Sequence, residues 1–135
     1  MFKRMSSMIV LALLVASMLA ACGGGAPAPV AFSSLPVFSG ATESTNELLT
    51  GLLQPMIEGS KAESTVKNVD GKAYDVPEGT TVDAVKSFYK SALEKGGWKE
   101  GQATEDGGVF VRGNQNLVIK YAEGVGLITV LIEAK

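Results

Sequence analysis

The side chains of this chain that could do chemistry are limited in kind. There is one cysteine, Cys22, and no histidine, which is the commonest general base and transition-metal ligand. Sites of the Ser-His-Asp or Cys-His type are therefore excluded, and one cysteine cannot build a disulfide framework or a multi-cysteine zinc site. The 14 acidic side chains show no EF-hand spacing, and no pair stands out for hydrolysis. We predict no catalytic residue, no metal site and no cofactor. The remaining enzymatic alternative is a carboxylate-dependent hydrolase.

Cys22 follows a segment with the layout of a secretory signal peptide. Lys3 and Arg4 form a positive n-region, an apolar run occupies residues 8–21, and the small residues Ala20 and Ala21 precede the cysteine. The apolar run is shorter than the roughly 20 residues that a membrane-spanning helix needs, so a permanent transmembrane anchor is the weaker interpretation.

The four residues Leu19-Ala20-Ala21-Cys22 resemble the lipobox of bacterial lipoproteins. The resemblance implies cleavage between Ala21 and Cys22, a diacylglycerol on the Cys22 thiol and often an acyl group on its amine. Two or more chains hold a protein stably on a membrane, whereas one chain binds only marginally. The implied location is the extracytoplasmic side of the cell membrane or the outer membrane. The alternative is a secreted protein whose cysteine happens to lie near the cleavage site.

The charge balance gives no reason to expect nucleic acid as a partner. The formal net charge is −2, and it becomes −4 when cleavage removes Lys3 and Arg4. An acidic chain has no general attraction for phosphate backbones or for anionic headgroups. We therefore expect the membrane as a partner through the covalent lipid alone, with an envelope protein as a second candidate partner.

The chain divides into a signal peptide over residues 1–21, a tether over residues 22–34 and a single domain over residues 35–135. The tether is rich in glycine, alanine and proline and has no helical or strand period, so we expect it to be flexible. In the domain, apolar spacing predicts a helix that begins with a Ser44–Glu47 capping box and breaks near Pro55. A second helix is predicted within residues 79–98, with Thr80 as its N-cap and Gly96 as the residue after its end.

The first of these helices carries an apolar face, made of Leu48, Leu49, Leu52, Leu53, Met56 and Ile57. Core packing is the simplest interpretation of such a stripe. Contact with a membrane or a partner is the alternative, although the polar positions carry Glu47 and Glu58 rather than lysines.

The remaining segments read as strands. Residues 62–79 are expected to form a hairpin with its turn at residues 68–71, because Asp70-Gly71 is a favoured type I′ pair. Four segments, 98–103, 107–113, 116–122 and 127–134, are expected to form an antiparallel meander. The predicted class is α+β, an antiparallel sheet of about four to six strands with one or two helices packed on one face.

Three tyrosines, Tyr74, Tyr89 and Tyr121, are the candidate binding residues. On a sheet with one covered face the other face could present aromatic rings, and a phenol can pair its hydroxyl with water or a ligand. Core packing is the alternative for each of them.

Residues 87–98, SFYKSALEKGGW, are similar to a feature of small bacterial secreted or lipid-anchored domains of unknown function. This second resemblance implies fold and compartment but no activity. The preceding VPEGTTVDAV also resembles the helix onset of PASTA modules, but the strand meander is too long for one such repeat. The expected function is a binding or scaffolding module of the cell envelope, not an enzyme. The alternative is a domain that binds a small ligand or an envelope polymer between helix and sheet.

Overall fold

A computed structural model describes residues 27–63 and 65–135, so Cys22 and the predicted signal peptide lie outside the described part of the chain. The described residues form one antiparallel sheet of six strands in the order β1-β2-β6-β5-β4-β3. Its strands are β1 (Thr42–Glu43), β2 (Asn68–Asp75), β3 (Lys99–Thr104), β4 (Gly107–Arg112), β5 (Gln115–Ala122) and β6 (Leu127–Ala134). The helices are η1 (Phe32–Ser34), α2 (Glu47–Gly51), α3 (Leu53–Ala62) and α4 (Val82–Lys95).

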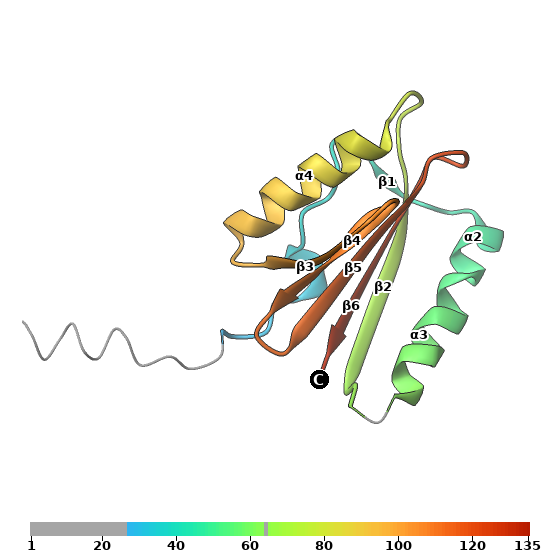
Figure 1. Cartoon of the computed structure of the whole chain (residues 1–135). Coiled ribbons are helices and arrows are strands. Elements are labelled where there is room, and N and C mark those ends of the chain that lie inside the picture. Colours follow the sequence, from blue (N-terminus) through green and yellow to red (C-terminus); the bar gives the residue numbers. More distant parts are fainter. Residues whose placement is uncertain (1–26, 64) are drawn as a thin grey trace, which may run out of the picture.

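The helices lie on opposite faces of the sheet (Figure 1). Helix α4 packs over β3, β4 and β5, whereas α2 and α3 pack over β2 and β6 on the other face. The predicted α+β class and the antiparallel sheet are confirmed. The helices, expected on one face, divide between both because β6 is apolar on both sides. Successive side chains of a strand point to opposite faces, so Ile128 and Val130 meet the α4 side and Leu127 and Leu131 meet the α3 side.

The larger core lies under α4. Val85, Tyr89 and Leu93 recur on one face of this helix, and all three are buried against the sheet. The helix ends where Gly97 adopts a left-handed φ of 84°, which only glycine takes readily. The chain then turns back, the Trp98 amide donates to the Leu93 carbonyl at 3.0 Å, and the indole is buried.

The α2–α3 unit has its N-cap two positions later than the predicted capping box. Asn46 is the N-cap residue, and its side-chain oxygen accepts from the amides of Leu48 and Leu49. Ser44 is instead buried, with its hydroxyl accepting from the Asn46 amide at 3.3 Å. The predicted break is confirmed at residue 52, between the two helices. Pro55 has no amide hydrogen to donate to the carbonyl of residue 51.

The predicted hairpin at residues 62–79 is wrong. Asp70 and Gly71 lie inside the continuous strand β2, where Gly71 pairs with Leu131 of β6. A Cβ built on Gly71 would lie 3.0 Å from Leu131 Cδ1 and 3.5 Å from Ile57 Cδ1. The glycine therefore makes room for α3 to approach the sheet, and eight paired positions with β6 outweigh the local turn preference.

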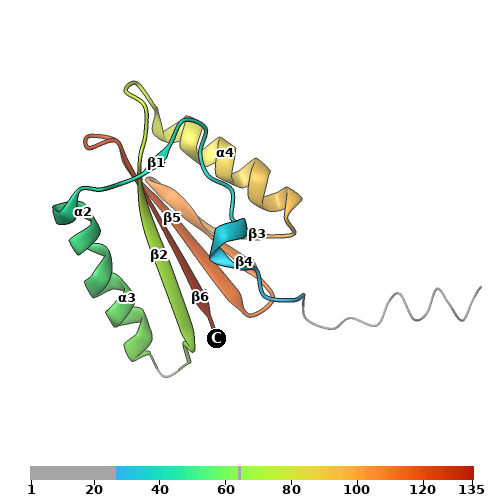
Figure 2. The same ribbon diagram turned by 180° about the vertical axis from the view of Figure 1, so that it is seen from behind.

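The segment before residue 35 is packed on the sheet (Figure 2). From this segment the chain continues along the α4 side of the sheet to β1, and after β1 it crosses to the other face and enters α2. The Val30 amide donates to Gln115 Oε1 at 2.7 Å, and Gln115 Nε2 donates back to the Val30 carbonyl at 3.0 Å. Val30 and Phe32 also pack against the α4-side core. The folded part of the chain therefore begins earlier than the predicted domain boundary at residue 35.

Candidate functional site

The three candidate tyrosines do not form a binding surface. Tyr74, Tyr89 and Tyr121 all belong to the core on the α4 side, where Tyr89 is 1% exposed and Tyr121 is 4% exposed. The prediction of exposed tips is wrong for these two, while Tyr74 is half-buried. Tyr121 lies on the same side of β5 as Leu117 and Ile119, because every second residue of a strand faces the same way.

The hydroxyls of the two buried tyrosines are in different situations. Tyr121 Oη donates to the Thr80 carbonyl at 2.8 Å. Tyr89 Oη is buried, and within residues 27–63 and 65–135 no atom completes a hydrogen bond with it. Burial raises the pKa of the Tyr89 hydroxyl to about 12. The nearby polar backbone of Phe38 lowers this pKa, but by less than burial raises it. Tyr89 is a structural group that favours its neutral form, not an exposed binding group.

An apolar groove lies on the other face of the sheet, between α2–α3 and the strands β5 and β6. Its volume is about 300 Å³. Its lining combines leucines and Met56 of the helices with residues near the β5–β6 turn, among them Val125 and Leu127. Four large apolar side chains at or near the groove are exposed: Leu48 (84%), Leu52 (66%), Met56 (38%) and Val125 (61%).

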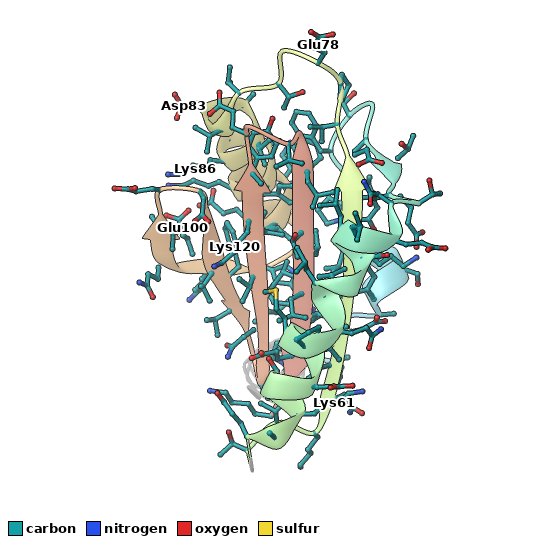
Figure 3. The ribbon with its side chains drawn as sticks, turned by 90° about the vertical axis from the view of Figure 1, so that its right-hand side faces the viewer. Lys61, Glu78, Asp83, Lys86, Glu100 and Lys120 are labelled. Atoms are coloured by element: carbon teal, nitrogen blue, oxygen red, sulfur yellow. The ribbon has the colours of Figure 1, made fainter. Side chains whose placement is uncertain are left out.

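The groove continues onto a part of the sheet that no helix covers. Helices α2 and α3 lie mainly over β2 and β6 and reach β5 at Val118, and most of the adjoining strands β5, β4 and β3 stays open on this face (Figure 3). The register places Gln102, Val109, Val118 and Leu131 in one row across these strands. Val111 stands in the row next to them and is exposed. The helix stripe and this row together form one surface, which we call the half-covered face: Leu48, Leu52, Met56, Val109, Val111 and Val118.

The charged side chains on the open strands of this face are lysines. Lys120 extends from β5 beside the α2–α3 unit (Figure 3). Lys99 of β3 pairs with Val111 of β4. Asp106 lies at the groove rim in the β3–β4 turn, where its carboxylate accepts from the Thr104 hydroxyl at 2.9 Å. The half-covered face is thus apolar at its centre and basic on its strands.

The free edge of the sheet at β3 is protected against strand addition. Lys86 Nζ donates to the carbonyl of Thr104 at 2.7 Å, which fixes a lysine beside the end of the edge strand. A bulge between Glu100 and Gln102 also disturbs its register. Charged side chains and bulges are the usual means by which proteins blunt a sheet edge. The β3 edge is therefore a poor template for the addition of another strand.

A larger hollow of about 500 Å³ lies at the opposite end of the strands, beside the Val30–Gln115 contact. Its lining mixes Lys67 and Lys135 with Asp70, and neither charge dominates it. Among the described residues, no three acidic or cysteine side chains gather as a metal site would require. In the same part of the chain, none of the helices combines the length and apolar character needed to cross a membrane.

Comparison with protein-family models, with curated proteins and with solved structures finds no match to this chain. The sequence signal for the half-covered face is the width of the apolar stripe on residues 48–57. Leu49, Leu53 and Ile57 are enough to pack one side of a helix on the sheet, and Leu48, Leu52 and Met56 are in excess of that need.

Proposed function

We propose that this chain is a lipid-anchored docking module on the extracytoplasmic side of a bacterial membrane, and that it binds a protein partner through the half-covered face. The observation that carries the docking role is the exposure of Leu48, Leu52 and Met56 beside an uncovered part of the sheet. Large exposed apolar patches on a soluble domain are typical of interaction sites. Lys99 and Lys120 favour a partner whose apolar surface is bordered by carboxylates.

The anchor is supported by the sequence. Cys22 ends a signal-peptide layout in the context LAAC, and only four residues separate it from Pro27, the first described residue. A lipid on Cys22 would hold the domain by the end of the sheet at which Val30 meets Gln115. The groove residue Ala122 lies seven residues further along the same strand, a distance of about 23 Å. The groove is thus carried away from the point of attachment.

A small apolar ligand is the second candidate for the groove. Its volume of about 300 Å³ lies at the lower end of the range for ligand pockets, and its floor is apolar. The exposed residues extend well outside the groove, to Leu48 at one end and Val111 on the open strands. This extent favours a protein surface over a small ligand.

The anchor is tested in the native host by metabolic labelling with a fatty acid. Cys22→Ser is expected to abolish labelling and to release the chain from the membrane, whereas Ser91→Ala, on the exposed face of α4, is expected to change neither. A Cys22→Ser chain that remains on the membrane contradicts the lipid anchor.

The docking role is tested by placing a photo-crosslinking amino acid at position 52 or at position 91 in the full chain. We expect a discrete crosslinked protein from position 52 and none from position 91. The crosslink at position 52 should disappear when Met56→Lys introduces a charge into the apolar stripe. Equal crosslinking at both positions, or none at either, contradicts docking at the half-covered face.

A further inference from the structure

We infer that the partner at the half-covered face is a second copy of this chain, related by a two-fold axis parallel to the strands. This inference rests on the proposed docking role of the same face. In this arrangement the two sheets face each other, and the α2–α3 unit of each copy lies over the open strands β5, β4 and β3 of the other. The pairing is self-complementary, as a two-fold interface must be, because one surface offers both the helix and the uncovered strands.

The α2–α3 unit and the open strip formed by β5, β4 and β3 have matching dimensions. Three neighbouring strands spaced about 4.8 Å apart present a strip about as wide as one helix with its side chains. The α2–α3 unit runs from Glu47 to Ala62, which corresponds to about 24 Å of helix. Strand β5 spans eight residues, or about 26 Å. One helical unit therefore covers the open strip without leaving a large part of it exposed.

Two helix glycines have no explanation within one copy. Gly51 and Gly59 have helical backbones, and a Cβ built on either would meet nothing within 4 Å. Glycine destabilises a helix interior relative to alanine. A helix position with room for a Cβ therefore normally carries a residue that favours the helix more than glycine does. At 100° per residue, Gly59 lies between Leu48 and Leu52 around the helix, on the stripe that would meet the partner's α2–α3 unit. A close approach by a second helix gives a reason for a small residue there.

The charges of the two parts are complementary. The α2–α3 unit carries Glu47 and Glu58, both exposed, with Lys61 in its last turn, and the open strands carry Lys99 and Lys120, with Asp106 in the β3–β4 turn. A two-fold axis parallel to the strands keeps each residue at the same height in both copies. Glu47 of one copy therefore comes toward the Lys120 end of the open strip in the other, and Glu58 toward the Lys99 end. Opposite charges at the border of an apolar interface set its register.

The axis direction follows from how each sheet is covered. An axis parallel to the strands places the covered half of one sheet opposite the open half of the other. An axis across the strands would instead place the two α2–α3 units on top of each other. The parallel axis also brings both Val30–Gln115 ends to the same end of the dimer. Both Cys22 residues could then anchor in one membrane, which raises the local concentration of the two copies.

The first test uses full-length protein in its membrane and a short bis-maleimide crosslinker. Met56→Cys places a thiol near the proposed axis, and Ser91→Cys places one on the exposed face of α4; both variants keep Cys22. We expect a covalent dimer from Met56→Cys and only the background of the unmodified chain from Ser91→Cys. Equal dimer yields from the two variants overturn the inference.

The second test exchanges charges and follows the monomer–dimer equilibrium of the detergent-solubilised full chain by sedimentation. Lys120→Glu is expected to weaken dimerisation at least tenfold, and the double variant Glu47→Lys with Lys120→Glu to recover most of the loss. Unfolding midpoints of the variants, measured at dilutions where the chain is monomeric, should stay the same, which separates an interface effect from misfolding. A double variant no tighter than the single one overturns the arrangement.

The two proposals can fail separately. If position 52 crosslinks to a protein of different mass and no dimer forms, the second copy is wrong and docking at the half-covered face stands. If position 52 yields no crosslink of any kind, both proposals are wrong.

Discussion

The two buried tyrosines should respond in opposite directions to loss of the hydroxyl. Tyr89→Phe removes a buried Oη that has no hydrogen-bond partner among the described residues. Leaving such a group unsatisfied costs about 1–3 kcal/mol, so its removal should raise the free energy of unfolding by about 1 kcal/mol after allowance for the small void created. Tyr121→Phe removes the 2.8 Å hydrogen bond to the Thr80 carbonyl and should lower stability by about 1 kcal/mol.

The same burial makes stability depend on alkaline pH. The pKa of Tyr89 is about 12 in the folded chain and near the ordinary tyrosine value of 10.0 in the unfolded chain. Between these values the unfolded state releases the proton first, so raising the pH favours unfolding. The expected slope is a loss of about 1.4 kcal/mol per pH unit, fully absent below pH 10. Tyr89→Phe should remove the largest part of this slope, whereas Tyr121→Phe should remove a smaller part, because burial also raises the pKa of Tyr121.

The assay is urea unfolding of the chain from residue 27 onward at pH 7 and between pH 10 and 12. Trp98 is the single tryptophan and is buried, so its fluorescence reports loss of the α4-side core. A Tyr89→Phe chain that is less stable than the parent at pH 7 would show that the hydroxyl is satisfied. An unchanged alkaline slope in that variant would show that Tyr89 is not the titrating group.

Three further predictions concern packing. Removal of residues 27–34 should lower the free energy of unfolding by about 2–4 kcal/mol in urea titrations, because both hydrogen bonds of Gln115 and the burial of Phe32 are lost. If the shorter chain is equally stable, the domain begins at residue 35 as the sequence predicted. Gly71→Val should cost about 1–3 kcal/mol in the same assay, since even a Cβ approaches Leu131 to 3.0 Å, and an unchanged midpoint would mean that α3 does not press on β2. Phe88→Ala should lower the thermal midpoint by an amount equivalent to about 2 kcal/mol, less than for a fully buried ring, because the ring is half-buried against Phe38 at a centroid distance of 5.3 Å; a neutral result would remove this ring pair from the account of stability.

Much of the fold follows from local signals in the sequence. Helix α4 has its apolar stripe and a glycine stop, and the strands from residue 99 onward are bounded by turn residues. The break before Pro55 follows from the missing amide hydrogen. These features depend on neighbours in the chain, so periodicity and turn chemistry are enough to predict them.

The features that the sequence did not reveal depend on long-range contacts. Asp70-Gly71 favours a turn locally, but β6 and α3 hold it extended. Tyr121 alternates in phase with Leu117 and Ile119, and that phase indicated burial, although the phenol group suggested an exposed tip. The half-covered face arises because α4 covers β3, β4 and β5 on one face of the sheet, whereas α2 and α3 cover β2 and β6 on the other face. No pattern within a single segment carries that information.

The docked segment at residues 27–34 has a mechanical consequence. A load applied through the N-terminus reaches the two Gln115 hydrogen bonds and the small contacts of Val30 and Phe32 before it reaches the sheet. Peeling this segment back to Leu35 would release eight residues, which add up to about 27 Å of reach while the rest of the fold stays intact. A single-molecule extension trace should record it as a short step at low force that precedes the unfolding of the domain. With the proposed lipid anchor in place, the connection between membrane and domain would have two lengths, one at rest and one under tension.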